Sequence, residues 1–184
     1  MSEHVSVLIS KEDVEKRIIE IADEINERFA GKSLHLVCVL KGGAFFMCEL
    51  AKHLSMPVSL DFMSVSSYGS ATKSSGVVKI VKDLDEPVKD KNVLVVEDIV
   101  DSGRTLSYLM EMLRDRGPAS LYLCTLLDKP ERRVVEVNVD YTGFKIPDKF
   151  VVGYGLDYDQ KYRNLPYIGV VEFDDETAGC GQEE

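Results

Sequence analysis

Three acidic residues stand close together where an apolar stretch of the chain ends. Residues 95–105 read VVEDIVDSGRT, so Glu97, Asp98 and Asp101 follow a strand-like run and precede a Ser-Gly-Arg-Thr turn. Because like charges at this spacing repel one another, we expect a cation or a polyhydroxylated ligand beside them. Ionised carboxylates accept hydrogen bonds from vicinal sugar hydroxyls, and they also bind hydrated Mg²⁺. The three acids therefore predict a site for a sugar, a metal ion or both.

The turn after these acids has the composition of a phosphate-binding loop. Gly103 permits a tight turn, and the amides of residues 101–105 would converge at the N-terminus of the helix that follows. The hydroxyls of Ser102 and Thr105 add two possible donors. In the alternative interpretation, Asp101 or Ser102 only caps the helix and the acids face water. Capping accounts for one acid but not for the adjacent pair, so we expect one compound ligand with sugar hydroxyls at one end and a phosphate at the other.

Alternating strands and helices must position these residues. Short apolar runs of strand length occur at 34–40, 58–65, 92–99 and 120–128, and extended structure is also predicted at 77–84. Helices are predicted between start and stop signals at 10–31, 44–55 and 104–117. This alternation predicts an α/β fold with a largely parallel sheet. Ligands bind at the carboxyl ends of such strands, so residues 41–43, 97–105 and 128–129 are expected on one rim.

Length and composition limit the class of protein. The 184 residues suit a single domain, predicted at 1–173, with an acidic, disordered tail at 174–184. No apolar stretch has transmembrane length and no signal peptide is recognised, so we expect a cytoplasmic protein without membrane attachment. With 22 basic and 32 acidic residues, the net charge of −10 argues against a nucleic-acid binder. The cysteines lack metal-site spacing and are expected to be unpaired, with Cys38, Cys48 and Cys124 in the core.

The segment VVEDIVDSGRT resembles the phosphoribosyl-diphosphate binding motif of type I phosphoribosyltransferases. The chain is similar in particular to their hypoxanthine (hypoxanthine-guanine) branch, because four further segments agree in order and spacing: VLKGGAFF, SSYGSATKSSGVVKI, LLDKPERR and GFKIPDKFVVGYGLDYDQKYRNLPYIGVV. Together these segments span most of residues 5–173. The resemblance implies the type I phosphoribosyltransferase fold, in which helices flank a mostly parallel central sheet that carries a small hood and a flexible lid loop.

The resemblance also implies how 5-phosphoribosyl 1-diphosphate is bound. Glu97 and Asp98 would hold the ribose hydroxyls, and the turn at 101–105, with Ser102, Gly103, Arg104 and Thr105, would hold the 5′-phosphate. The diphosphate would be bound by three elements. These are a loop with a non-proline cis peptide (Lys41, Gly42 and Gly43), the lid (Ser67 and Tyr68) and Arg163. Mg²⁺ would be bound by Glu97, Asp98 and Asp157. The residues alone also allow a plain strand-to-helix turn at 41–43 and a mobile hairpin at 66–76.

For the purine, the resemblance implies four contacts and one proton carrier. Phe150 would stack on the base, Val151 would supply backbone contacts, Asp157 would lie close by, and Asp101 would act as general acid/base at the imidazole ring. Lys129 would donate to the purine 6-oxygen. Adenine has an amino group there, and unpaired donors cost about 1–3 kcal/mol each, so a 6-oxopurine is favoured. The residues alone also allow Lys129 to be an exposed loop lysine, and they favour a core position for Phe150.

The predicted function is purine salvage. A glycosyltransferase of nucleotide metabolism would transfer the phosphoribosyl group to hypoxanthine, and also to guanine, and the family leads us to expect a homodimer or homotetramer. Two other classes remain open. A regulatory sensor with this fold would bind nucleic acid without catalysis, but no basic face or DNA-binding extension is visible in the sequence. A receiver-type signalling domain would use the acids for Mg²⁺ and phosphate, but it would leave Lys129 and the FVVGYGLDY segment without a role.

Overall fold

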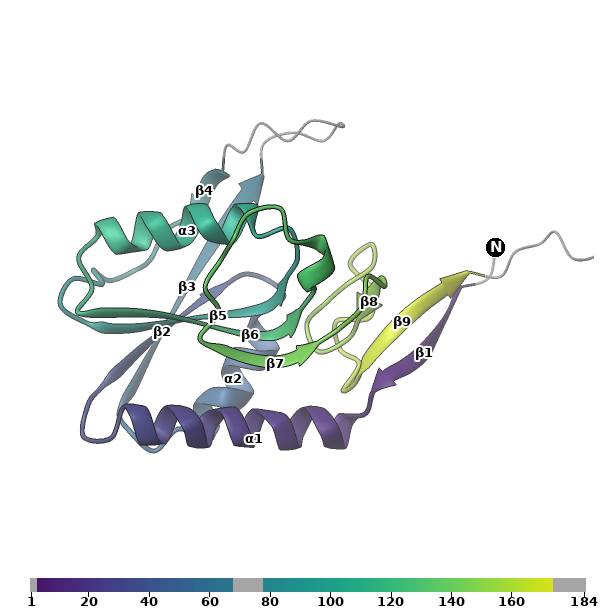
Figure 1. The fold of residues 1–184 in the computed structure, drawn as a ribbon, viewed down its shortest axis with the longest axis horizontal. Coiled ribbons are helices and arrows are strands. Elements are labelled where there is room, and N and C mark those ends of the chain that lie inside the picture. Colours follow the sequence, from purple (N-terminus) through teal and green to yellow (C-terminus); the bar gives the residue numbers. More distant parts are fainter. Residues whose placement is uncertain (1–2, 68–77, 174–184) are drawn as a thin grey trace, which may run out of the picture.

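The computed structural model describes residues 3–67 and 78–173, and a six-stranded sheet forms its centre (Figure 1). The strand order is β4-β3-β2-β5-β6-β7. The strands are β2 (Leu34–Val39), β3 (Val58–Ser67), β4 (Val78–Lys82), β5 (Asn92–Val100), β6 (Ser120–Asp128) and β7 (Tyr141–Lys145). Every neighbouring pair is parallel except β3 with β4. The prediction of an α/β fold with a largely parallel sheet is confirmed.

Helices cover both faces of this sheet (Figure 1). Helices α1 (Lys11–Arg28) and α2 (Ala44–Lys52) lie on one face and α3 (Arg104–Asp115) on the other. The period of two along β5 explains the two layers, because Leu94 and Val96 pack on the α1 side whereas Val93 and Val95 pack on the α3 side. Helix α1 starts as predicted, since the Ser10 hydroxyl accepts a hydrogen bond from the Asp13 amide at 3.1 Å.

A second, antiparallel sheet forms the hood at the right-hand end of Figure 1. Its order is β1-β9-β8, with β1 (Glu3–Ile9), β8 (Val151–Val152) and β9 (Ile168–Phe173). We did not predict β1 from the sequence. Its partner β9 lies at the other end of the described chain, with Glu3 opposite Phe173, and Val7 is 60% exposed, so a clear inward-outward alternation is missing.

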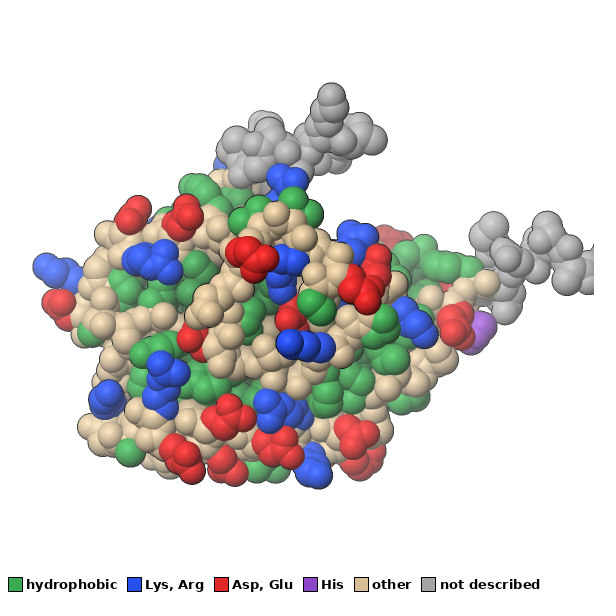
Figure 2. Space-filling model, viewed as in Figure 1, with side chains coloured by type: hydrophobic (Ala, Val, Ile, Leu, Met, Phe, Trp, Pro, Cys, Tyr) green, Lys and Arg blue, Asp and Glu red, His purple; other side chains and the backbone are tan. Residues whose placement is uncertain are grey.

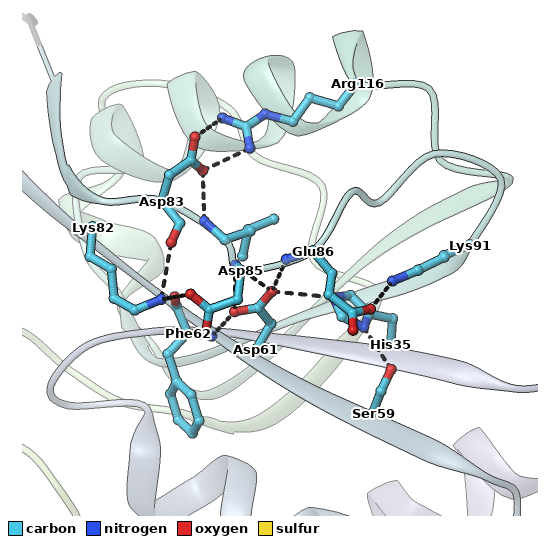
Figure 3. A network of polar contacts seen from close by, with 11 residues as sticks. His35, Ser59, Asp61, Phe62, Lys82, Asp83, Asp85, Glu86, Lys91 and Arg116 are labelled. Carbon is cyan, nitrogen blue, oxygen red and sulfur yellow. Dashed lines mark hydrogen bonds and ion pairs between the residues drawn. The ribbon is translucent and has the colours of Figure 1, made fainter.

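A buried carboxylate ties the connection between β4 and β5 to strand β3 (Figure 3). Asp61 is 3% exposed, and its carboxylate accepts hydrogen bonds from the amides of Phe62 at 2.7 Å, Asp85 at 2.9 Å and Glu86 at 3.2 Å. Burial by itself would raise the pKa of Asp61, but these three amides outweigh it and hold the pKa below its ordinary value. The loop is therefore fixed by a fully ionised acceptor.

A buried histidine lies beside this carboxylate in Figure 3. His35 is 3% exposed, its Nδ1 is 2.7 Å from the Ser59 hydroxyl, and its Nε2 is 3.9 Å from Oδ2 of Asp61. Burial and the charge of Lys91 lower the pKa of His35, whereas Asp61 and Glu86 act in the opposite direction. The imidazole is consequently neutral near pH 7.

The thiols of the described residues are free, but they are not all in the core. Cys38 and Cys124 are buried as expected, whereas Cys48 is exposed, so its prediction as a core residue was wrong. Helix α2 buries Phe46, Met47 and Leu50, and Cys48 lies on its other side. No helix among the described residues is both long enough and apolar enough to span a membrane. The predicted tail at 174–184 lies outside the described residues.

Candidate active site

The predicted site residues gather at the carboxyl ends of three neighbouring strands. Lys41 follows β2, Glu97 and Asp98 lie near the end of β5, and Lys129 follows β6. Strand β5 pairs with β2 on one side and with β6 on the other. The chain runs outward from β2 to β3 and then from β5 to β6, so the topology switches between β2 and β5. Such a switch point is where open α/β sheets bind ligands.

A hollow of about 230 Å³ lies at the N-terminus of α3. It is lined by Val39, Glu97, Ile99, Asp101, Ser102, Gly103, Thr105 and Leu106. Gly103 is the residue before the helix, has a left-handed φ of 80° and carries no capping side chain. The Ser102 hydroxyl accepts a long hydrogen bond from the Arg104 amide at 3.5 Å, and Asp101 accepts none from the first turn among the described residues, so side-chain capping leaves most of these amides available. Uncapped amides at the positive end of the helix dipole form a site for a phosphate group.

Segment 133–135 fixes the turn at 101–103 through hydrogen bonds to its backbone carbonyls. The Arg133 guanidinium donates to the Asp101 carbonyl at 2.8 Å and pairs with the Asp128 carboxylate. The amide of Val135 donates to the Ser102 carbonyl at 3.1 Å. A Cβ atom at Gly103 would lie 2.3 Å from the Val135 carbonyl oxygen, so only glycine fits here.

Burial shifts the pKa values of both adjacent acids upward. Glu97 is 8% exposed, and burial together with repulsion by Asp98 raises its pKa well above the ordinary value. Burial also raises the pKa of Asp98 to about 6, which Asp157 reinforces and Arg163 opposes. The amide of Ile99 donates to Asp98 at 2.7 Å. A cation or sugar hydroxyls would relieve the cost of ionising this pair.

The loop after β2 lies directly against these acids. The peptide bond between Leu40 and Lys41 is cis, as the resemblance led us to expect. A Cβ atom at Gly42 would lie 1.5 Å from Oδ2 of Asp98, and one at Gly155 would lie 2.0 Å from the Gly42 carbonyl oxygen. The loop is therefore packed between the acidic strand end and the hood. Lys41 is exposed, and its ammonium group is 3.3 Å from the Gln160 side chain.

Two residues in the connection between β8 and β9 complete this side of the site. Arg163 pairs with Asp157 at 2.7 Å and donates to the Gly155 carbonyl at 2.7 Å. The second carboxylate oxygen of Asp157 accepts the Gln160 amide at 2.8 Å. The influence of Arg163 and Asp157 on the pKa of Asp98 places both near the acidic pair. No group of three or more potential ligands among the described residues is arranged to bind a metal ion by itself.

A second cavity of about 340 Å³ lies beside the phosphate hollow. It is lined by Ile99, Asp101, Lys129, Arg132, Asp148, Phe150, Val151, Leu156 and Asp157. Lys129 is only 8% exposed and donates to the Lys149 carbonyl at 2.6 Å, so its interpretation as an exposed loop lysine is wrong. Phe150 is 53% exposed and contacts Tyr158 edge to face at 5.5 Å, so it is not a core residue. An aromatic face and a cation thus border one cavity.

Asp101 and Ile99 line both cavities, so the two form one composite site with Asp101 at the boundary. The sequence did not lead us to Arg132 or Asp148. Their only signal was their place in charged segments next to predicted residues, PERR after Lys129 and IPDK before Phe150. Of the predicted lid residues, Tyr68 lies outside the described residues, and Ser67 ends β3 with a side chain that is also outside them.

Known proteins resemble this chain over most of its length. A family model, the phosphoribosyl transferase domain, matches residues 5–159. A hypoxanthine phosphoribosyltransferase of Salmonella typhimurium is 50% identical over 178 residues, which cover 96% of this chain and 100% of the relative. A hypoxanthine-guanine phosphoribosyltransferase of Bacillus subtilis is 50% identical over 166 residues, covering 90% and 92%. The crystal structure of a hypoxanthine-guanine phosphoribosyltransferase of Bacillus anthracis has a TM-score of 0.88 at 43% identity and covers 94% and 100% of the two chains. This chain belongs to the phosphoribosyl transferase family.

Proposed function

We propose that this protein is a purine salvage enzyme that transfers the 5-phosphoribosyl group from 5-phosphoribosyl 1-diphosphate to hypoxanthine and to guanine. The products are the purine nucleoside 5′-monophosphate and diphosphate. Relatives that are 50% identical are named for these substrates. The observation that carries the proposal is the composite site, in which a phosphate hollow and a base-sized cavity meet at a single carboxylate, Asp101.

On the donor side, binding is divided among three elements. The uncapped amides of α3 hold the 5′-phosphate, Glu97 and Asp98 hold the ribose hydroxyls, and the loop at 41–43 with Arg163 receives the diphosphate. Mg²⁺, when bound with the donor, neutralises charge on the departing diphosphate. Glu97, Asp98 and Asp157 suit such an ion, since burial raises the pKa of Glu97 and of Asp98, repulsion by Asp98 adds to the shift of Glu97, and Asp157 adds to that of Asp98. A few carboxylates completed by substrate oxygens and water are the usual surroundings of Mg²⁺.

The residues of the second cavity orient the base. Lys129 has three N–H donors, of which one is used by the Lys149 carbonyl, so others remain for a purine 6-oxygen. Phe150 stacks on the ring and the Val151 backbone contacts its edge. A ring nitrogen attacks the anomeric carbon as the bond to diphosphate breaks, and the imidazole proton passes to Asp101. We further propose that the enzyme is cytoplasmic and acts as a homodimer or homotetramer.

The test is diphosphate release with Mg²⁺ and 5-phosphoribosyl 1-diphosphate, run separately with hypoxanthine, guanine, xanthine and adenine. Fast release with the first two and little with adenine is expected. Asp101→Asn should slow transfer by roughly 10²- to 10⁴-fold without loss of donor binding. Lys129→Gln should reduce discrimination against adenine, whereas Lys149→Gln, which leaves the backbone carbonyl in place, should not.

No release with any base, despite tight donor binding, would instead favour the regulatory sensor. That protein would need a surface for nucleic acid. On the face shown in Figure 2, basic and acidic side chains are intermixed, and the net charge is −10. A salt-dependent mobility shift with RNA and DNA would then be the next measurement, and binding that weakens steeply with salt would support the sensor.

A further inference from the structure

A guanidinium group joins the two carboxylates that border the base cavity. Arg132 is the last residue of a short 3-10 helix, η1 (Pro130–Arg132), which begins directly after Lys129. Its Nε donates to Oδ1 of Asp101 at 3.0 Å, and its terminal nitrogen donates to Oδ2 of Asp148 at 3.4 Å. All three side chains line the same cavity. The link therefore lies inside the proposed site.

The geometry leaves one oxygen of Asp101 for the substrate. Arg132 occupies Oδ1, and Oδ2 accepts no hydrogen bond from the described residues. Arg133 binds the Asp101 carbonyl at 2.8 Å, so neighbouring arginines hold the side chain and the backbone of the same residue. A general base works best when a third group fixes its orientation, and a guanidinium can do so while the second oxygen stays free for the proton.

Asp148 gives the guanidinium a second anchor and connects it to Lys129. One Asp148 oxygen faces Arg132 at 3.4 Å, and the other is 3.7 Å from the Lys129 ammonium group. Asp101, Arg132, Asp148 and Lys129 thus form a row of alternating charge along the cavity wall. The row begins at the proton carrier and ends at the proposed donor to the 6-oxygen, so both polar contacts to the base share one scaffold.

We propose that Arg132 is a positioning residue for phosphoribosyl transfer, which holds Asp101 by Oδ1 and directs Oδ2 to the imidazole ring of the base. This inference rests on the proposed function. The ion pairs of Arg132 contribute little to the stability of the fold. The side chain of Arg132 is 50% exposed, and those of Asp101 and Asp148 are 44% and 47% exposed. Exposed pairs of this kind contribute little to stability. The effect of its removal should therefore appear in turnover.

The experiment compares Arg132→Gln, Arg132→Lys and the control Glu131→Gln by steady-state diphosphate release. Glu131 precedes Arg132 in the same short helix, and its side chain has no hydrogen-bond or ion-pair partner among the described residues. Arg132→Gln should lower kcat roughly ten- to a hundredfold, a part of what acid–base catalysis contributes, with little change in the KM of the donor or in Tm. Arg132→Lys should recover part of kcat because a charge remains, and Glu131→Gln should match the unmodified protein.

A double-mutant cycle with Asp101→Asn separates positioning from other roles. If Arg132 acts through Asp101, Arg132→Gln should have almost no further effect on kcat in the Asp101→Asn background. An equal loss in both backgrounds would overturn the inference, and so would an unchanged or increased kcat in the single variant. If the unmodified protein released no diphosphate with any base, the proposed function itself would fail, and that outcome is distinguishable because it precedes any variant.

Discussion

Replacing Asp98 by Asn should stabilise the ligand-free protein while weakening its use of the donor. The carboxylate of Asp98 lies against Gly42 and next to Glu97, and burial raises its pKa from 3.8 to about 6. An acid whose folded pKa lies above its unfolded value opposes folding when it is ionised. This penalty is fully present above about pH 6 and disappears as the pH falls from 6 towards 3.8. Asparagine removes the charge but keeps an oxygen for the Ile99 amide.

The size of the effect follows from the shift. A rise of about 2 pKa units corresponds to about 3 kcal/mol at 1.36 kcal/mol per unit, which is an upper limit. Asp98 is only half-buried, so we expect about 1–2 kcal/mol. For a chain of this length, such a gain raises Tm by roughly 2–8 °C. Donor use should fall because a ribose hydroxyl loses its ionised acceptor.

Urea unfolding followed by circular dichroism, at pH 8 and pH 5 in EDTA, would measure this difference. The margin over the unmodified protein should be largest at pH 8 and about half as large at pH 5. Asp23→Asn, on the exposed face of α1, is the control and should show no such pH dependence. A less stable Asp98→Asn at pH 8, or the same margin at both pH values, would refute the assignment of a buried, destabilising charge.

Three further outcomes can be checked. Asp61→Asn should lower the free energy of unfolding, measured in urea, by about 1–3 kcal/mol, because three amides lose an ionised acceptor. The control Asp85→Asn should leave this free energy unchanged, because the Asp85 side chain is 79% exposed. Gly103→Ala should lower both the stability and the donor affinity, because φ at this position is 80° and the added Cβ would clash with the Val135 carbonyl oxygen. Gly31 has a φ of 72° but no neighbour within 4 Å, so Gly31→Ala should lower the stability only by the cost of a left-handed backbone, about 1–2 kcal/mol. His35 has a folded pKa below its unfolded 6.5, so stability present above pH 6.5 should fall as the pH drops below it, and His35→Gln should flatten that fall in urea titrations.

Local signals in the sequence were sufficient for most of the central domain. Ser10 caps α1, and the apolar spacing of α1 puts Val14, Ile18, Ile21, Ile25 and Phe29 in the core. The apolar spacing of α3 likewise matches its buried residues, Leu106, Leu109, Met110 and Leu113. The strands at 34–40, 92–99 and 120–128 were recognisable because burial on both faces leaves continuous apolar runs. The rim that carries Lys41, Glu97 and Lys129 then followed from the topology.

The remaining features depend on contacts between distant segments. Strand β1 needs β9, and nothing within EHVSVLI indicates that partner. Helix α2 is apolar around most of its surface, so its sequence does not reveal that Cys48 and Phe45 face solvent. The burial of Lys129 depends on a carbonyl twenty residues away in the chain. The bridge from Arg132 to Asp101 and Asp148 likewise joins three segments with no shared local pattern.

Because β1 pairs with β9, the phosphate hollow and the base cavity are expected to form at different stages of folding. The phosphate hollow is built from β5 and α3, which are close in sequence and lie within the central domain. The base cavity depends on β8, which pairs with β9, and β9 in turn pairs with the first strand described. Closing so long a loop is entropically costly and slow. During synthesis, a nascent chain can therefore form its phosphate hollow well before residue 173 emerges, and it completes its base cavity last.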